Sequence, residues 1–470
     1  MITIDLSYFE TLSVMSPLAI MWRLFADGGW VIILWVFLWG SWEIWVNWRQ
    51  NLYEAKRRWI FLAIDIPKAV LDEPGQSPLA VENIFAHLDG AHGSDTLWEK
   101  YWGGKTQDWF SLEIVSMEGY IQFVIRTRDK FRDLVEAAIY AQYPDAEITE
   151  VVDYTKPAPK TFPDPEWELF GTEWINVKPD AYPLRTYHDF EDPATKEFKD
   201  PLAAMLETMS RIGKGEQIWF QILITSISQK EWTRKGDNLV KKLIGAKVEA
   251  KETWLSKVVD LPGKVADTAL TQILSSAEEA PPKKREEKKE ASMMQYLSPG
   301  TKTLVEAIER KLSKIGFQTK VRMIYLGKKE VFKKARAAHP IVGAIKQFST
   351  MDGQSIKPEY KKVGTAAHYI FIKRRLKWKK EKIMRAYRGR STSRGLGKGF
   401  ILNIEELATM WHFPANWIKA PPVKTVESKR GVPPINLPFE QPSYMKPMKE
   451  TGGEEEEPSK EAPPSLPAAK

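Results

Sequence analysis

The sequence predicts an α+β protein with one N-terminal transmembrane helix followed by two ferredoxin-like (split βαβ) cytoplasmic domains. A disordered insertion and a disordered C-terminal tail complete this fold class. Three observations predict it: an apolar run at 28–48, strand and helix patterns in the order β-α-β-β-α-β, and charged or proline-rich tracts between them. A mean hydropathy of −0.37 indicates that any membrane segment is an anchor on a folded body.

Residues 28–48 are expected to cross the membrane as a helix. The run GGWVIILWVFLWGSWEIWVNW approaches the roughly 20 residues that span a hydrocarbon core, and Glu43 is its one ionisable residue. Basic residues at 49 and 56–58 follow the run, whereas only Arg23 precedes it. The positive-inside rule therefore predicts a single-pass plasma-membrane protein with its N-terminus outside and its C-terminal domains in the cytoplasm.

Tryptophans are unusually dense in this run, and two interpretations stay open. Trp42, Trp45 and Trp48 fit an aromatic belt at the inner interface, with Glu43 reaching the lipid headgroups. Alternatively, one helix face could pack on a second span and form a homo-oligomer, with Glu43 as a polar contact. The membrane-facing candidates are Trp30, Trp35, Trp39, Trp42, Glu43, Trp45 and Trp48.

The cytoplasmic part divides into two predicted domains because apolar periodicity stops at a proline-rich linker. Strands of the first domain are expected at 59–66, 109–115, 120–126 and 146–153, and helices at 78–87 and 128–142. The predicted boundaries are 1–27 for an interfacial segment, 28–48 for the transmembrane helix, 59–155 for the first ferredoxin-like domain, 156–165 for the linker, 166–360 for a second α+β domain with a helical and disordered insertion at about 230–297, 361–440 for a basic segment and connecting element, and 441–470 for the disordered tail.

No catalytic constellation emerges from the residues. The chain has no cysteine, which removes disulfides and thiolate chemistry. The glycine cluster at 395–399 lacks the first glycine and the Ser/Thr that a phosphate-binding P-loop needs. His87 and His92 match no metal-ligand spacing. We therefore predict a non-enzyme with no cofactor and no metal.

The segment 370–390 is the strongest candidate for binding. From Lys373 to Lys398 the chain has twelve Lys or Arg and one acid, so this stretch outweighs the net charge of +8. Cations with interleaved aromatics suit single-stranded nucleic acid, anionic lipid or an acidic partner, or simply a solvated surface. The candidate residues are Lys373, Arg374, Arg375, Lys377, Trp378, Lys379, Lys380, Lys382, Arg385, Tyr387, Arg388 and Arg390.

Two segments carry a resemblance to a known family. They are FILNIEELATMWHFP at 400–414, with the prolines at 421–422 and 433–438, and AQYPDAE at 141–147 with the VDY at 152–154. In this order they resemble the N-terminal accessory, non-ATPase region of conjugation and type IV secretion coupling ATPases. The Walker motifs of the longer relatives are missing from this chain.

The resemblance implies a membrane-anchored accessory or scaffold protein that docks a separate hexameric ATPase at the cytoplasmic face. The alternative is a membrane-tethered protein that binds single-stranded nucleic acid, such as DNA, through its basic segment. The segment 402–411 also has a plain interpretation, as a capped amphipathic helix that packs in a domain core. The candidate docking residues are Glu405, Glu406, Leu407, Trp411, His412, Phe413 and Pro414.

Overall fold

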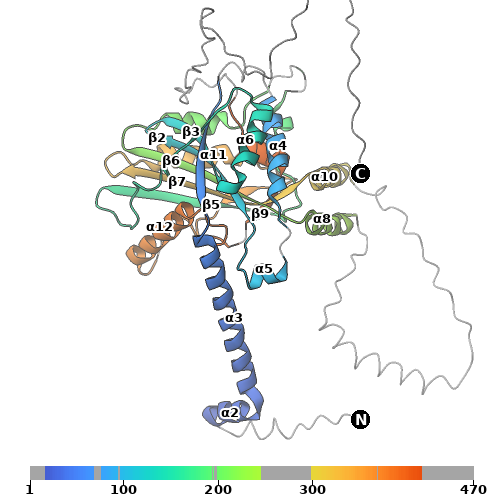
Figure 1. The fold of residues 1–470 in the computed structure, drawn as a ribbon, viewed down its shortest axis with the longest axis vertical. Helices are drawn as coiled ribbons and strands as arrows, with labels where there is room; N and C mark the ends of the chain where they lie inside the picture. The colour runs from blue at the N-terminus through green and yellow to red at the C-terminus, as the bar shows by residue number, and fades with distance from the viewer. Residues whose placement is uncertain are drawn as a thin grey trace, which may run out of the picture. The chain divides into compact units, whose positions relative to one another are not determined.

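A large antiparallel sheet organises the chain (Figure 1). The computed structural model describes residues 16–67, 76–93, 96–192, 194, 198–244, 298–367, 369–397 and 399–414. In this part of the chain the sheet has nine strands in the order β4-β1-β3-β2-β6-β7-β5-β8, with β9 paired to β7. The strands are β1 (Trp59–Asp65), β2 (Trp109–Met117), β3 (Tyr120–Arg128), β4 (Glu147–Glu150), β5 (Trp167–Asn176), β6 (Glu216–Ser226), β7 (Gly316–Lys328), β8 (Ile356–Pro358) and β9 (Phe400–Asn403).

Helices cover both faces of the sheet, so the central strands bury side chains on both sides. One core contains side chains of α4, α6, α7, α11 and α13, and a smaller core on the opposite face lies under α12. The helices are α2 (Pro17–Leu24), α3 (Trp30–Ala55), α4 (Gln76–Leu88), α5 (Leu97–Tyr101), α6 (Arg132–Gln142), α7 (Ala203–Ser210), α8 (Gln229–Leu243), α10 (Pro299–Leu312), α11 (Lys334–Lys346), α12 (Ile372–Arg388) and α13 (Ile404–Met410).

The prediction of two separate ferredoxin-like domains is wrong. Strand β2, from the first predicted domain, pairs with β6, from the second, along its whole length from Trp109↔Thr225 to Met117↔Gln217. A long apolar edge strand exposes unpaired backbone groups, and joining two such edges satisfies them. The strands therefore form one continuous sheet, and β9 with α13 joins it rather than a separate connecting element.

The prediction of a transmembrane helix at 28–48 is also wrong, and with it the predicted single-pass topology and location. None of the helices in the described ranges combines the length and the apolar character that crossing a bilayer requires. Helix α3 starts after a kink at Gly28 (φ 116°), and Glu43 and Asn47 interrupt its apolar sequence. Towards its end α3 packs on α5, where the Arg49 Nε donates to the Trp102 carbonyl at 2.8 Å.

Four predicted segments lie wholly or partly outside the described residues. They are the C-terminal tail at 441–470, most of the insertion at 230–297, of which α8 is described, residues 1–15 of the interfacial segment, and residues 415–440 of the connecting element, with the prolines at 421–422 and 433–438.

Candidate functional site

A row of polar side chains crosses four neighbouring strands on the face that α12 covers. Glu113 on β2 is opposite Gln221 on β6, Gln221 is opposite Arg322 on β7, and Arg322 is opposite Glu173 on β5. Because side chains alternate along a strand, these four point to the same face. All four are buried, so each polar group needs a partner inside the protein.

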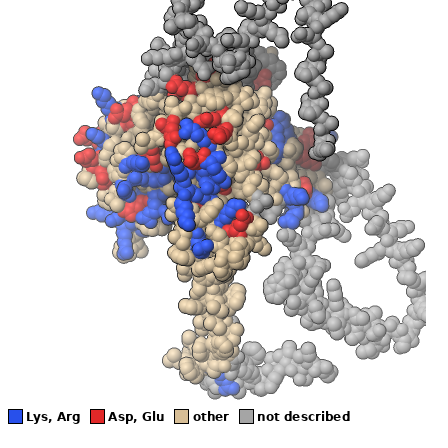
Figure 2. All heavy atoms as spheres, in the orientation of Figure 1, with Lys and Arg blue, Asp and Glu red and all other residues tan. Residues whose placement is uncertain are grey.

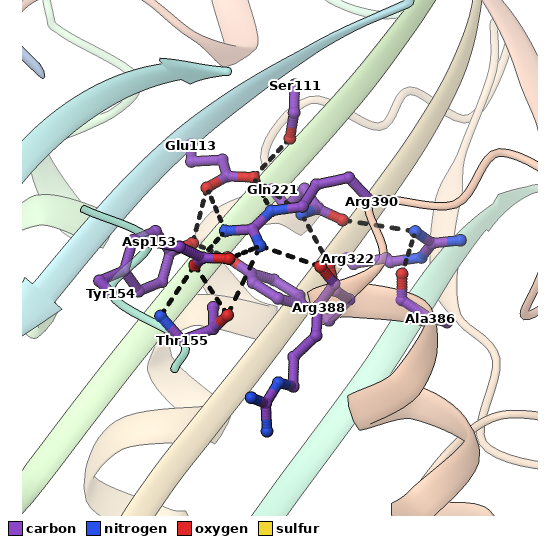
Figure 3. A network of polar contacts seen from close by, with 11 residues as sticks. Ser111, Glu113, Asp153, Tyr154, Thr155, Gln221, Arg322, Ala386, Arg388 and Arg390 are labelled. Carbon is purple, nitrogen blue, oxygen red and sulfur yellow. Dashed lines mark hydrogen bonds and ion pairs between the residues drawn. The ribbon is translucent and has the colours of Figure 1, made fainter. Parts of the chain in front are cut away.

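Arg390, two residues beyond the end of α12, is the charge partner of Glu113 in this row (Figure 3). Its guanidinium contacts Glu113 at 3.0 Å and 3.2 Å, and Asp153 at 2.8 Å and 3.1 Å. Both contacts are two-pronged, which is the strong geometry for Arg and carboxylate. Arg390 is 1 % exposed and Glu113 is fully buried, so the pair is shielded from water.

The carboxylates of this network are held ionised. Burial on its own raises the pKa of Glu113, but Arg390 and the hydroxyls of Ser111 and Tyr154 outweigh it and leave the pKa below its usual value. Asp153 has a lowered pKa for the same reason, with burial opposed by Arg390. Burial raises the pKa of Tyr154 and so keeps its hydroxyl protonated, and this hydroxyl donates to Glu113 at 2.8 Å.

The same network holds the C-terminal end of α12. Arg322 donates to the carbonyl of Ala386 at 3.2 Å, and Arg390 donates to the carbonyl of Arg388 at 2.9 Å. Carbonyls in the last turn of a helix lack intrahelical partners and carry partial negative charge, so two guanidinium groups satisfy both needs. The sheet therefore fixes where α12 ends.

The buried side of α12 packs on the sheet and uses several predicted binding residues for structure. The Lys379 ammonium donates to the carbonyl of Ala366 at 2.8 Å. Lys380 forms an ion pair with Glu168. Tyr387 is buried, and its hydroxyl lies 2.8 Å from that of Tyr154. Lys379, Lys380, Tyr387 and Arg390 are thus unavailable to an external ligand.

The opposite side of α12 presents cations and an aromatic ring to solvent. Trp378 is 58 % exposed, and the Lys382 ammonium lies 4.8 Å from the centre of its ring. Figure 2 shows Lys and Arg gathering over and beside this helix. We call this set the exposed face of α12; its members are Lys373, Arg374, Arg375, Lys377, Trp378 and Arg385, with Lys382 and Arg388 half-buried at its edge.

The predicted docking residues lie in the core instead. Trp411 is fully buried against Phe85 and Phe123. Glu406 pairs with Lys311 at 3.0 Å, and the carboxylate of Glu405 lies 2.6 Å from the Lys314 ammonium. Of the predicted set, Glu405, Glu406, Leu407, Trp411, His412 and Phe413 are buried and Pro414 is half-buried. Their burial favours the packing interpretation over direct contact with a partner.

The tryptophans predicted to face a membrane lie along α3. Trp35 stacks on Trp39 with ring centres 6.5 Å apart, and Trp45 packs edge-on against Trp102 near α5 at 5.1 Å. The exposed members of the predicted set are Trp30, Trp35, Trp39, Trp42, Glu43 and Trp48, while Trp45 is half-buried. In the ranges that the structure describes, acidic and histidine side chains form no cluster able to hold a metal ion.

Sequence reasoning missed the polar row beneath α12. A signal was present, because Glu113 in WFSLEIVSM, Gln221 in QIWFQILITS and Arg322 in KVRMIYL are each an isolated polar residue inside an apolar strand. An isolated polar side chain in a strand that is buried on both faces requires a buried partner. The identity of that partner depends on strand pairing, which no single segment encodes.

Fold and site together define a protein with one antiparallel sheet that carries a basic helix on a buried polar network. The chain belongs to the family described as domain of unknown function DUF8128, whose family model matches residues 87–426. No curated protein matches the chain. The matched range begins in α4 and includes the polar row, α12 and α13.

Proposed function

We propose that this protein is a non-catalytic binding protein that holds single-stranded nucleic acid on the exposed face of α12. One observation supports this most directly: the helix segregates its cations, placing one set against the sheet and leaving another in solvent beside Trp378. Phosphates are neutralised by Lys and Arg, and bases stack on aromatic rings without regard to sequence.

The contacts that fix α12 to the sheet support the same proposal. A flexible basic segment loses conformational entropy when it binds a strand, whereas a helix fixed to a sheet has already lost it. Arg322 and Arg390 secure the C-terminal turn, and Lys380 anchors the middle of the helix through Glu168. The exposed cations therefore project from a rigid support.

The test is a charge-reversal variant of the full chain, Lys373→Glu with Arg374→Glu and Lys377→Glu. Fluorescence anisotropy with a labelled single-stranded oligonucleotide should show binding at least about 10-fold weaker, because three phosphate contacts are lost. The salt slope of log K should become shallower by about 2, at roughly 0.7 per lost contact. Trp378→Ala should weaken binding by about 1–3 kcal/mol if a base stacks on the ring.

A matched control reverses three exposed lysines on α10 and α11, Lys302, Lys334 and Lys346. It makes the same change in net charge away from α12 and should leave affinity within about two-fold, since surface charges far from the contact are screened. Equal losses in both triple variants would contradict a site on α12. Binding to anionic vesicles with no binding to the oligonucleotide would assign the face to lipid instead.

A protein partner is a second proposal, supported by the resemblance to accessory regions of conjugation ATPases and by an exposed aromatic surface on α5. Leu97 is 74 % and Trp98 68 % exposed, and Trp98 stacks on Trp102 with ring centres 5.0 Å apart. Exposed apolar clusters mark interaction sites. We propose that a separate motor ATPase docks here. Leu97→Asp with Trp98→Asp should abolish co-sedimentation with such a purified ATPase, and unchanged co-sedimentation would exclude this surface.

A further inference from the structure

A cavity opens on the sheet just beyond the end of α12. It measures about 350 Å³, near the lower end of the roughly 300–1,000 Å³ typical of small-molecule sites. Its floor continues the face that bears the polar row: Leu223 on β6 is opposite Lys320 on β7, and Thr225 is opposite Gln318. The segment after α12 and helix α8 form its walls.

Lys320 is the unusual group in this cavity. It is 6 % exposed, and its ammonium donates to the carbonyl of Arg394 at 2.9 Å. No carboxylate lines this cavity among the described residues. Burial, with the charge of Arg322, lowers the pKa of Lys320 to about 8, and Glu173 opposes the shift only in part. Within this cavity, as the described residues line it, Lys320 therefore faces no carboxylate, and Glu173 acts on it only from the neighbouring side.

The remaining walls supply further donors and an apolar surface. Lys235 of α8 adds a second cation, and Ser228 and Thr392 add hydroxyls to that of Thr225. Trp232 also lines the cavity; it is 1 % exposed, and its indole Nε1 is buried with no hydrogen-bond partner in the described part of the chain. Trp232 therefore contributes an apolar part of the wall.

We propose that this cavity binds a phosphate-bearing ligand of nucleotide size, with Lys320 and Lys235 on the phosphate and Trp232 beside the body. Two cations match the charge of a phosphate monoester, which is close to −2 at pH 7. Its oxygens can accept from several donors at once, which suits this set of ammonium and hydroxyl groups. The source is a free mononucleotide or the 5′-phosphate of a strand.

A neighbouring cavity shows the contrast. It measures about 230 Å³ and shares Lys320 and Gly399 with the first, but Glu173 and Asp180 also line it. Two acidic side chains oppose an anion through repulsion when they are ionised. The proposal therefore concerns the cavity beside α8.

The test is calorimetric titration of the full chain with AMP, and with adenosine as the ligand that lacks phosphate. AMP should bind saturably and adenosine should not. Lys235→Ala, at an exposed position, should weaken AMP binding about 10-fold or more, because one charge-assisted hydrogen bond is lost. Lys320→Met should weaken it at least as much. Lys346→Ala on α11, an exposed position outside the cavity, is the control and should bind AMP as the unaltered chain does.

The outcomes separate this proposal from the one for α12, on which it does not rest. The α12 charge-reversal variant should lose oligonucleotide binding and keep AMP binding. This result would support both proposals and show that the two sites are separate. A 5′-phosphorylated oligonucleotide that competes with AMP, where its 5′-hydroxyl form does not, identifies a strand end as the ligand. No competition identifies the free nucleotide. Three results would overturn the proposal of a phosphate-ligand site in this cavity. They are no AMP binding at millimolar concentration, adenosine binding as tight as AMP binding, or full AMP affinity in both Lys235→Ala and Lys320→Met.

Discussion

The pair formed by Arg390 and Glu113 should be the most sensitive point of the structure. The two side chains meet at 3.0 Å and 3.2 Å, and neither is more than 1 % exposed. Removing one partner of such a pair leaves a buried charge uncompensated, at a cost of about 3–5 kcal/mol. Arg390→Met and Glu113→Leu should each lower the free energy of unfolding by about this amount. The double variant should lose at least about 2 kcal/mol less than the sum, because it buries no unpaired Glu113 or Arg390 charge.

The pH dependence of stability provides an independent test, because the direction in which stability changes with pH can be predicted. Arg390 holds the pKa of Glu113 below its usual value, so in the unaltered chain this carboxylate contributes stability at neutral pH that is lost as the pH falls through its folded pKa. In Arg390→Met the buried carboxylate has lost its cation, so its pKa should rise above the usual value. Protonation then relieves the penalty, and the stability difference between the two proteins should shrink from pH 7 towards pH 4.

The assay is urea denaturation of the full chain followed by circular dichroism, with unaltered slopes as evidence that the same transition is measured. Glu113→Gln, which keeps the shape but removes the charge, is the matched control. Additive losses in the double variant, or a stability difference that does not change with pH, would refute the description of the pair as a coupled buried contact.

Two further predictions concern packing. Gly399→Ala should cost several kcal/mol and displace β9, because the added Cβ would clash with the Thr319 carbonyl. Gly300→Ala in α10, where the added Cβ meets nothing within 4 Å, should be neutral or slightly stabilising, and equal melting temperatures for the two variants would contradict this. Trp411→Ala should lower the free energy of unfolding by about 3–5 kcal/mol, because the ring is fully buried. Trp98→Ala, at a 68 % exposed position, should change the free energy of unfolding by less than about 0.5 kcal/mol. The midpoints of denaturant unfolding curves compare the two variants directly.

Local patterns in the sequence predicted most individual elements. The strand expected at 59–66 is observed as β1, and the helix expected at 128–142 is observed as a short 3-10 turn followed by α6. The capped helix expected at 402–411 is α13, with Asn403 accepting from the Glu406 amide. These elements were predictable because periodicity and caps act over a few residues.

Which surfaces those elements bury was not predictable in the same way. The apolar run at 28–48 matched a membrane span in length, yet no described helix has the apolar character to cross a bilayer. The sequence ELATMWHFP looked like a docking motif by resemblance, but its side chains lie in the core. Burial depends on what packs against a segment, and that partner is remote in the chain.

The sequence by itself determined that the chain contains apolar strands, has a concentrated basic segment and lacks cysteine chemistry. Only the tertiary structure decided that β2 and β6 join two strand sets into one sheet, and that Lys379, Lys380 and Arg390 point inward while Lys373, Arg374 and Lys377 remain exposed. The physical reason is that composition sets the charge of a helix, whereas the row of Glu113, Gln221 and Arg322 sets which side of it faces the sheet. That row exists only after three strands have paired in register.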